Sequence, residues 1–194
     1  MNLPNKLTLL RVFLIPFFLI CMYLKFPFHY LAALVIFSAA SITDALDGKI
    51  ARSRNLVTNF GKFLDPLADK VLVLAALAVF VEIPDIKVGA VPLIIISARE
   101  FMVSGLRLLA ANSGIVVAAG MWGKLKTAFT MVAIITALVW LSACSDFGFG
   151  FPAVFCDIVN LWVIPILIWI STVLTIISGA IYLKGYWNLI DTDK

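Results

Sequence analysis

Histidine and cysteine are scarce in this sequence. Its 194 residues include one histidine, His29, and three cysteines, and the cysteines form no CxxC pair. The side chains for a His/Cys zinc site are therefore missing, which argues against zinc chemistry. Cys144 and Cys156 could pair within one outer loop, or each could be buried as a small hydrophobic side chain. The sequence leaves both states open.

Charged residues are scarce as well. Only 13% of the residues are charged and 63% are hydrophobic, with a mean hydropathy of +1.09. These values lie far outside the range of soluble domains. A membrane-spanning helix needs about 20 apolar residues, so the chain has room for roughly six of them and for no separate soluble domain. We therefore expect one all-α integral membrane domain over residues 1–194, with no soluble basic surface for nucleic acid.

Apolar runs bounded by charged and turn residues predict where the spans lie. The six predicted transmembrane helices cover about 7–25, 30–52, 65–82, 88–108, 124–143 and 158–183. The first run has no small-residue cleavage site before Lys25, so we interpret it as a retained span. In this layout Lys25 and Lys87 lie on one side, and the other Lys and Arg residues lie on or near the opposite side. The positive-inside rule then places both termini in the cytoplasm.

Four aspartates stand out in the stretch DALDGKIARSRNLVTNFGKFLDPLAD. Asp44 and Asp47 are three residues apart, and Asp65 and Asp69 are four apart, so each pair lies on one helical face. The first pair is near the cytoplasmic end of the second predicted helix and the second pair is near the start of the third. A short connection makes these helices antiparallel neighbours, so we expect the two pairs to converge.

Converging carboxylates point to a metal site. Four of them in a low-dielectric setting would repel strongly unless cations lay among them. An all-oxygen set favours Mg²⁺, Mn²⁺ or Ca²⁺, and two such ions would suit a phosphoryl or pyrophosphate substrate. Alternatively, the acids are solvated helix ends or pair with nearby Lys and Arg residues. Because ionisable groups inside a membrane are costly, we favour the metal site.

A second set of candidates is cationic. Arg99 and Arg107 are eight residues apart, about two helical turns, and so share a face. Lys124 and Lys126 open the fifth predicted helix. Together with Arg52 these residues could form a pocket for an anionic acceptor alcohol. The alternatives are pairing of Arg99 with its neighbour Glu100, or a role of these cations in membrane topology alone.

The aspartate stretch fits the pattern D-x2-D-G-x2-A-R-x8-G-x3-D-x3-D without a substitution, and it resembles the CDP-alcohol phosphotransferase family. The resemblance implies six transmembrane helices, a short N-terminal interfacial helix and a homodimer. It implies an enzyme in which an alcohol attacks a CDP-linked substrate and CMP leaves. Two divalent cations, Mg²⁺ or Mn²⁺, would bind Asp44, Asp47, Asp65 and Asp69, and Asp69 would also be the general base. The residues implied near the CDP group are Asn5, Thr8, Asp44, Gly48, Ala51 and Arg52.

Further segments extend the resemblance over most of the chain, namely NLPNKLTLLRVFLIPFF, GKFLDPLADKVLV, SAREFMVSGLR and GKLKTAFTMVA. They are similar to bacterial family members that transfer a phosphatidyl group from CDP-diacylglycerol to glycerol 3-phosphate. The resemblance thus implies synthesis of an anionic phospholipid precursor in the bacterial inner membrane, among membrane lipids, with the active site facing the cytoplasm. The acceptor phosphate would bind Arg99, Arg107, Lys124 and Lys126.

Two other functions stay open at this stage. Within the family, the acceptor could be inositol phosphate, serine or a second phosphatidylglycerol. Outside it, the chain could be a cation carrier whose aspartates bind the transported ion. A carrier would place these acids near the middle of the bilayer with access from both sides, whereas here they cluster at one end of the predicted helices.

Overall fold

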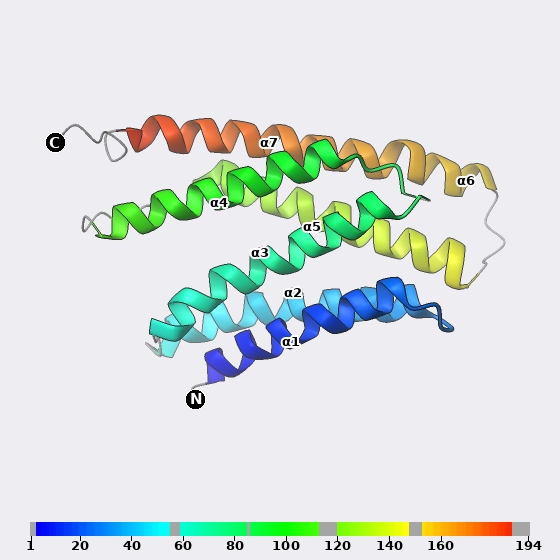
Figure 1. Ribbon diagram of the computed structural model, residues 1–194, viewed down its shortest axis with the longest axis horizontal. Helices are drawn as coiled ribbons and strands as arrows, with labels where there is room; N and C mark the ends of the chain where they lie inside the picture. Colours follow the sequence, from blue (N-terminus) through cyan, green and yellow to red (C-terminus); the bar gives the residue numbers. More distant parts are fainter. Residues whose placement is uncertain (1–2, 55–58, 85, 113–119, 148–152, 188–194) are drawn as a thin grey trace.

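The structure, a computed structural model, consists of helices joined by short connections, with no strand among the described residues (Figure 1). The backbone is described for residues 3–54, 59–84, 86–112, 120–147 and 153–187, and the side chains for 6–44, 67–84, 86–110, 120–147 and 154–187. In chain order the helices are α1 (Leu3–Tyr23), α2 (His29–Arg54), α3 (Asn59–Glu82), α4 (Ala90–Asn112), α5 (Met121–Leu141), the π-helix η1 (Ser142–Asp146), α6 (Ala153–Ile158), the π-helix η2 (Val159–Val163) and α7 (Ile164–Gly185).

Each predicted span overlaps a helix or, for the last two, a run of consecutive helices. By length and apolar character, three helical segments of the described chain could cross a membrane: 6–23, 121–146 and 154–185. A shorter apolar stretch covers 29–44. The all-helical membrane class is therefore confirmed, while the count of six spans stays a prediction.

The long helices run up and down in one elongated bundle (Figure 1). α1 packs against α2 and α3, and α7 packs against α4 and α5. Alanines with no exposed surface, such as Ala33, Ala76 and Ala137, let these helices approach closely. The ends of α1, α3 and η1 lie at one end of the bundle (Figure 1). The start of α1 and the ends of α2, α4 and α7 lie at the other, which we call the site end.

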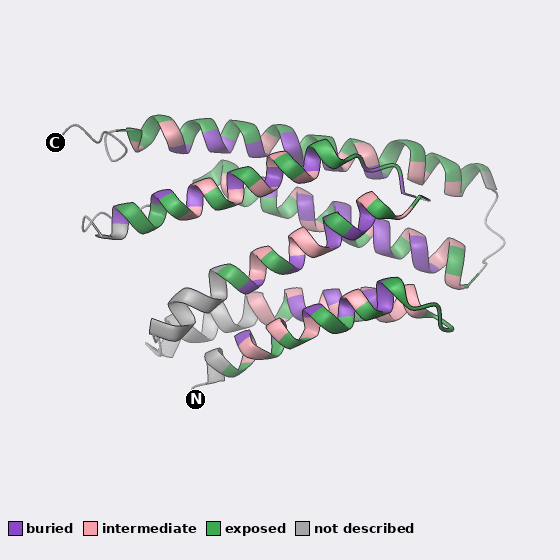
Figure 2. Ribbon diagram, in the orientation of Figure 1, coloured by how far each residue is buried: buried purple, intermediate pink, exposed green. Residues whose placement is uncertain are grey.

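Buried and exposed side chains divide along the helix faces (Figure 2). Phe18, Phe37 and Phe80 are completely buried in the core, where the rings of Phe18 and Phe37 lie 5.9 Å apart. The outward faces carry many large apolar side chains, among them Ile94 and Trp162. In water such a surface would be unfavourable, so it fits contact with lipid chains.

The opening segment differs from the expectation of a separate interfacial helix. α1 begins at Leu3 and continues without interruption to Tyr23. The side chains of Thr8 and Arg11 are buried within the bundle. The described backbone from Leu3 onward therefore forms one continuous helix with the first predicted span, and it contains no separate interfacial helix.

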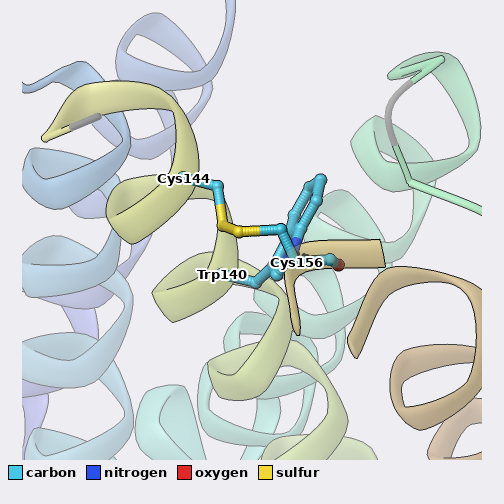
Figure 3. Close-up of a disulfide and its surroundings, with 3 residues drawn as sticks. All are labelled: Trp140, Cys144 and Cys156. Atoms are coloured by element: carbon cyan, nitrogen blue, oxygen red, sulfur yellow. Dashed lines mark hydrogen bonds between the residues drawn. A yellow bond between two sulfur atoms is a disulfide. The ribbon is translucent and has the colours of Figure 1, made fainter. Parts of the chain in front are cut away.

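The end opposite the site is cross-linked. Cys144 of η1 and Cys156 of α6 form a disulfide, which decides between the two states that the sequence left open (Figure 3). The indole Nε1 of Trp140 donates a hydrogen bond to the Cys156 carbonyl oxygen at 2.9 Å. The Asp146 carboxylate accepts one from the Leu31 backbone N–H at 2.7 Å. These contacts join η1 to α6 and to the start of α2.

Candidate active site

Two predicted metal ligands have described side chains. Asp44 lies on α2 and Asp69 on α3, and each carboxylate is within electrostatic range of the other. One member of each predicted pair is therefore described on neighbouring helices, while the convergence of the two pairs stays a prediction. The other predicted residues of this region lie outside the described side chains: Asn5, Asp47, Gly48, Ala51, Arg52 and Asp65.

A buried arginine lies beside these carboxylates. Arg11 of α1 has no exposed surface, and its Nη1 lies 2.8 Å from Oδ1 of Asp44. Its charge also acts on Asp69. Thr8, implied near the CDP group, is buried one turn earlier on the same helix. Sequence analysis missed Arg11, although an arginine inside an apolar run was an available signal.

A cavity of about 460 Å³ connects Asp69 to a group of cations. Its walls come from α3, α4, α5 and α7. Two carboxylates, those of Asp69 and Glu100, line it together with five cationic side chains, those of Lys70, Arg99, Arg107, Lys124 and Lys126. The four cations assigned to the acceptor phosphate are thus brought into one cavity with Asp69. This excess of positive charge suits a phosphorylated ligand.

Arg99 is the most constrained of these cations. Its Nη2 donates to Ser178 Oγ at 2.5 Å, and its Nη1 lies 3.3 Å from Glu100 Oε1. A Cβ at Gly179 would lie only 3.2 Å from the Arg99 Cγ, so glycine lets α7 approach this side chain. The pairing with Glu100 considered as an alternative role is present, but the same arginine also lines the cavity.

Tyr182 of α7 orients both arginines. Its hydroxyl accepts hydrogen bonds from Arg107 Nη2 at 3.0 Å and from the Gly120 backbone N–H at 3.1 Å. Its ring faces the Arg99 and Arg107 guanidinium groups at 5.4 and 5.7 Å, a cation–π arrangement. Sequence analysis missed Tyr182, because nothing in its local sequence indicates that α7 ends beside α4.

Glu100 is a third residue that sequence analysis did not assign to the site. Its Oε1 contacts both Lys126 Nζ on α5 and Arg99 Nη1 on its own helix. The Lys126 residue is only 7% exposed, so this ion pair is largely removed from solvent. The Glu100 side chain is itself only 14% exposed, so one largely buried carboxylate ties the two cations together.

The described residues can be tested for their fit to a metal ion. Asp44 keeps 40% of its side-chain surface exposed, and Asp69 lines the cavity, so both carboxylates border open space. Their hard oxygen atoms suit Mg²⁺ or Mn²⁺. Among the described side chains no group of three or more His, Cys, Asp or Glu lies together. The described pair therefore fits as half of the predicted ligand set.

Comparison with protein families adds an independent observation. The model of the CDP-alcohol phosphatidyltransferase family matches residues 1–177. The chain belongs to this family. The motif that suggested the family therefore lies within the matched segment, as do Arg11, Glu100 and the cationic side chains of the cavity.

Members of the CDP-alcohol phosphatidyltransferase family from several bacteria are similar over most of their length. A Bacillus subtilis protein is 41% identical over an alignment of 205 positions, which covers 100% of this chain and 99% of the relative. A Rickettsia bellii protein is 40% identical over 184 residues, 95% of this chain and 94% of the relative. Both are named CDP-diacylglycerol–glycerol-3-phosphate 3-phosphatidyltransferase.

Proposed function

We propose that the protein transfers the phosphatidyl group of CDP-diacylglycerol to glycerol 3-phosphate, giving phosphatidylglycerophosphate and CMP. The observation that carries this proposal is the cavity in which Asp69 and five cations meet. The acceptor must bring a hydroxyl to the reaction and a phosphate to a cationic surface, and this cavity provides for both. The names of the bacterial relatives give the same reaction.

In the proposed mechanism the residues of the chain bind and orient the acceptor, and one of them accepts a proton. The acceptor phosphate binds Arg99, Arg107, Lys124 and Lys126. Asp69 accepts the proton of the 1-hydroxyl, whose oxygen forms a bond to the β-phosphorus of CDP-diacylglycerol. The bond from that phosphorus to the bridging oxygen breaks, and CMP leaves.

The aspartate cluster serves the donor. Two divalent cations, Mg²⁺ or Mn²⁺, bound to Asp44, Asp47, Asp65 and Asp69, would neutralise the pyrophosphate and stabilise the departing CMP. The guanidinium of Arg11 pairs with Asp44 and lowers the repulsion between the carboxylates. The proposed CDP contacts are Asn5, Thr8, Asp44, Gly48, Ala51 and Arg52. The homodimer and the single domain over 1–194 stay predictions.

We further propose that the site end and both termini face the cytoplasm of the bacterial inner membrane. Disulfides persist in oxidising compartments, so the end with the Cys144–Cys156 disulfide fits the outer side. A Lys184→Cys variant should react with a membrane-impermeant maleimide only after cells are broken, whereas Lys87→Cys should react in intact spheroplasts. Both lysines are exposed, Cys21 is buried, and the other cysteines are paired. The reverse labelling pattern would contradict this orientation.

An acceptor assay tests the proposed reaction. Purified protein in detergent, given CDP-diacylglycerol, Mg²⁺ and glycerol 3-phosphate, should release CMP, and a metal chelator should stop the release until Mg²⁺ is added in excess. Inositol phosphate and serine are tested as alternative acceptors under the same conditions. Faster release with either of them would assign a different acceptor, and no release with any acceptor would favour the cation carrier.

A further inference from the structure

A second, much smaller cavity adjoins the first. Its volume is about 30 Å³, and it shares part of its wall with the larger cavity. The shared residues are Asp69, Lys70, Glu100, Lys126 and Thr127. Its own walls add the apolar side chains of Val73, Leu74 and Ile96 and the buried Thr130. A space of this size holds a group of roughly one or two water molecules, too small for a phosphate but sufficient for a hydroxyl.

Glu100 gives this small cavity a strong acceptor. Its carboxylate is held in place by Lys126 and Arg99, which both contact Oε1. A carboxylate has about four acceptor positions, so these two contacts leave capacity for a hydrogen bond from a hydroxyl. The second carboxylate of the cavity wall, that of Asp69, is already assigned to the proton of the attacking hydroxyl.

We propose that this small cavity is a subsite for the middle hydroxyl of the acceptor, and that Glu100 determines specificity by accepting its hydrogen bond. The inference rests on the proposed function. With the acceptor phosphate among the cations and the attacking hydroxyl at Asp69, the carbon between them carries a hydroxyl at the shared wall of the two cavities. The acceptor class is therefore a phosphorylated vicinal diol, and a simple phosphorylated alcohol is a poor substitute.

The apolar walls make this recognition selective. An acceptor without the middle hydroxyl would leave Glu100 without this hydrogen-bond partner, in a cavity that Val73, Leu74 and Ile96 also line. Sites built to bond a substrate hydroxyl discriminate strongly against analogues that lack it, because their buried polar groups are then unpaired.

The test compares glycerol 3-phosphate with 3-hydroxypropyl phosphate, which lacks only the middle hydroxyl. The wild-type protein should favour glycerol 3-phosphate in kcat/KM by about tenfold or more. Glu100→Met should reduce this ratio to near one, and Glu100→Gln, which keeps a neutral acceptor, should give an intermediate ratio. Both acceptors are assayed on the same preparation, so partial misfolding of a variant cancels from the ratio.

Glu82→Met is the matched control, because it makes the same chemical change at an exposed carboxylate at the end of α3. Glu82 lines neither cavity, so its loss should leave the ratio unchanged. A wild-type protein that uses both acceptors equally, or a Glu100→Met variant with the wild-type ratio, would overturn the subsite and leave the proposed function intact. No CMP release with either acceptor would overturn both.

Discussion

Replacing Asp69 with Asn should lower CMP release by about 10²- to 10⁴-fold, the range that a positioned general base contributes. The amide has nearly the same shape as the carboxylate, but it cannot take the proton of the acceptor hydroxyl and is a weaker ligand for a hard cation. Asp69 lines both the large and the small cavity, and the charge of Asp44 acts on its carboxylate. The measurement is initial CMP release at saturating glycerol 3-phosphate and CDP-diacylglycerol.

The control for this variant is Asp157→Asn. Asp157 is an exposed aspartate of α6, at the end of the bundle away from the site. The same chemical change there should leave CMP release near the wild-type value. Thermal unfolding in detergent should be similar for both variants, because Asp69 lies at a cavity wall. Near-normal CMP release from the Asp69 variant would remove this residue from the proposed mechanism.

Much of the fold could be predicted because apolar run length is a direct signal of membrane helices. Each of the six predicted ranges overlaps a helix or a run of consecutive helices, although α3 begins at Asn59, before the predicted start at residue 65. The prediction placed the start of α3 too late because the first turns of this helix are polar. An apolar run indicates contact with lipid, whereas a helix can begin before the apolar run does. The disulfide could not be predicted, because it depends on where η1 and α6 lie relative to each other.

The candidate site was partly predictable for a similar reason. Helical spacing within one segment predicted that Asp44 and Asp69 belong to neighbouring helices, and the cations of α4 and α5 do line one cavity with Asp69. Arg11, Glu100 and Tyr182 were missed, since each acts through a partner on another helix. Tyr182 bonds Arg107, a residue 75 positions away in the chain. Such contacts follow from the packing of α4 against α7, which local sequence patterns do not encode.

The Arg99→Met variant should raise the KM for glycerol 3-phosphate by about 10²-fold and change the KM for CDP-diacylglycerol little. The variant loses the charge pair between the guanidinium and the acceptor phosphate, and truncating one member of a buried, hydrogen-bonded charge pair typically costs this much. Glu100 would retain Lys126 as its partner, so the site should otherwise keep its contacts. The measurement is steady-state kinetics with each substrate varied in turn.

Two further variants separate phosphate binding from structural support. Arg99→Lys keeps the charge but loses the planar guanidinium group, which bonds Ser178 and Glu100 at the same time. It should therefore recover only part of the acceptor affinity. Lys184→Met removes an exposed cation that lies outside the cavity lining, and both KM values should stay unchanged. If Arg99→Met raised the KM for CDP-diacylglycerol as much as that for glycerol 3-phosphate, the arginine would support the whole site. The acceptor phosphate would then have to be held by Arg107, Lys124 and Lys126 alone.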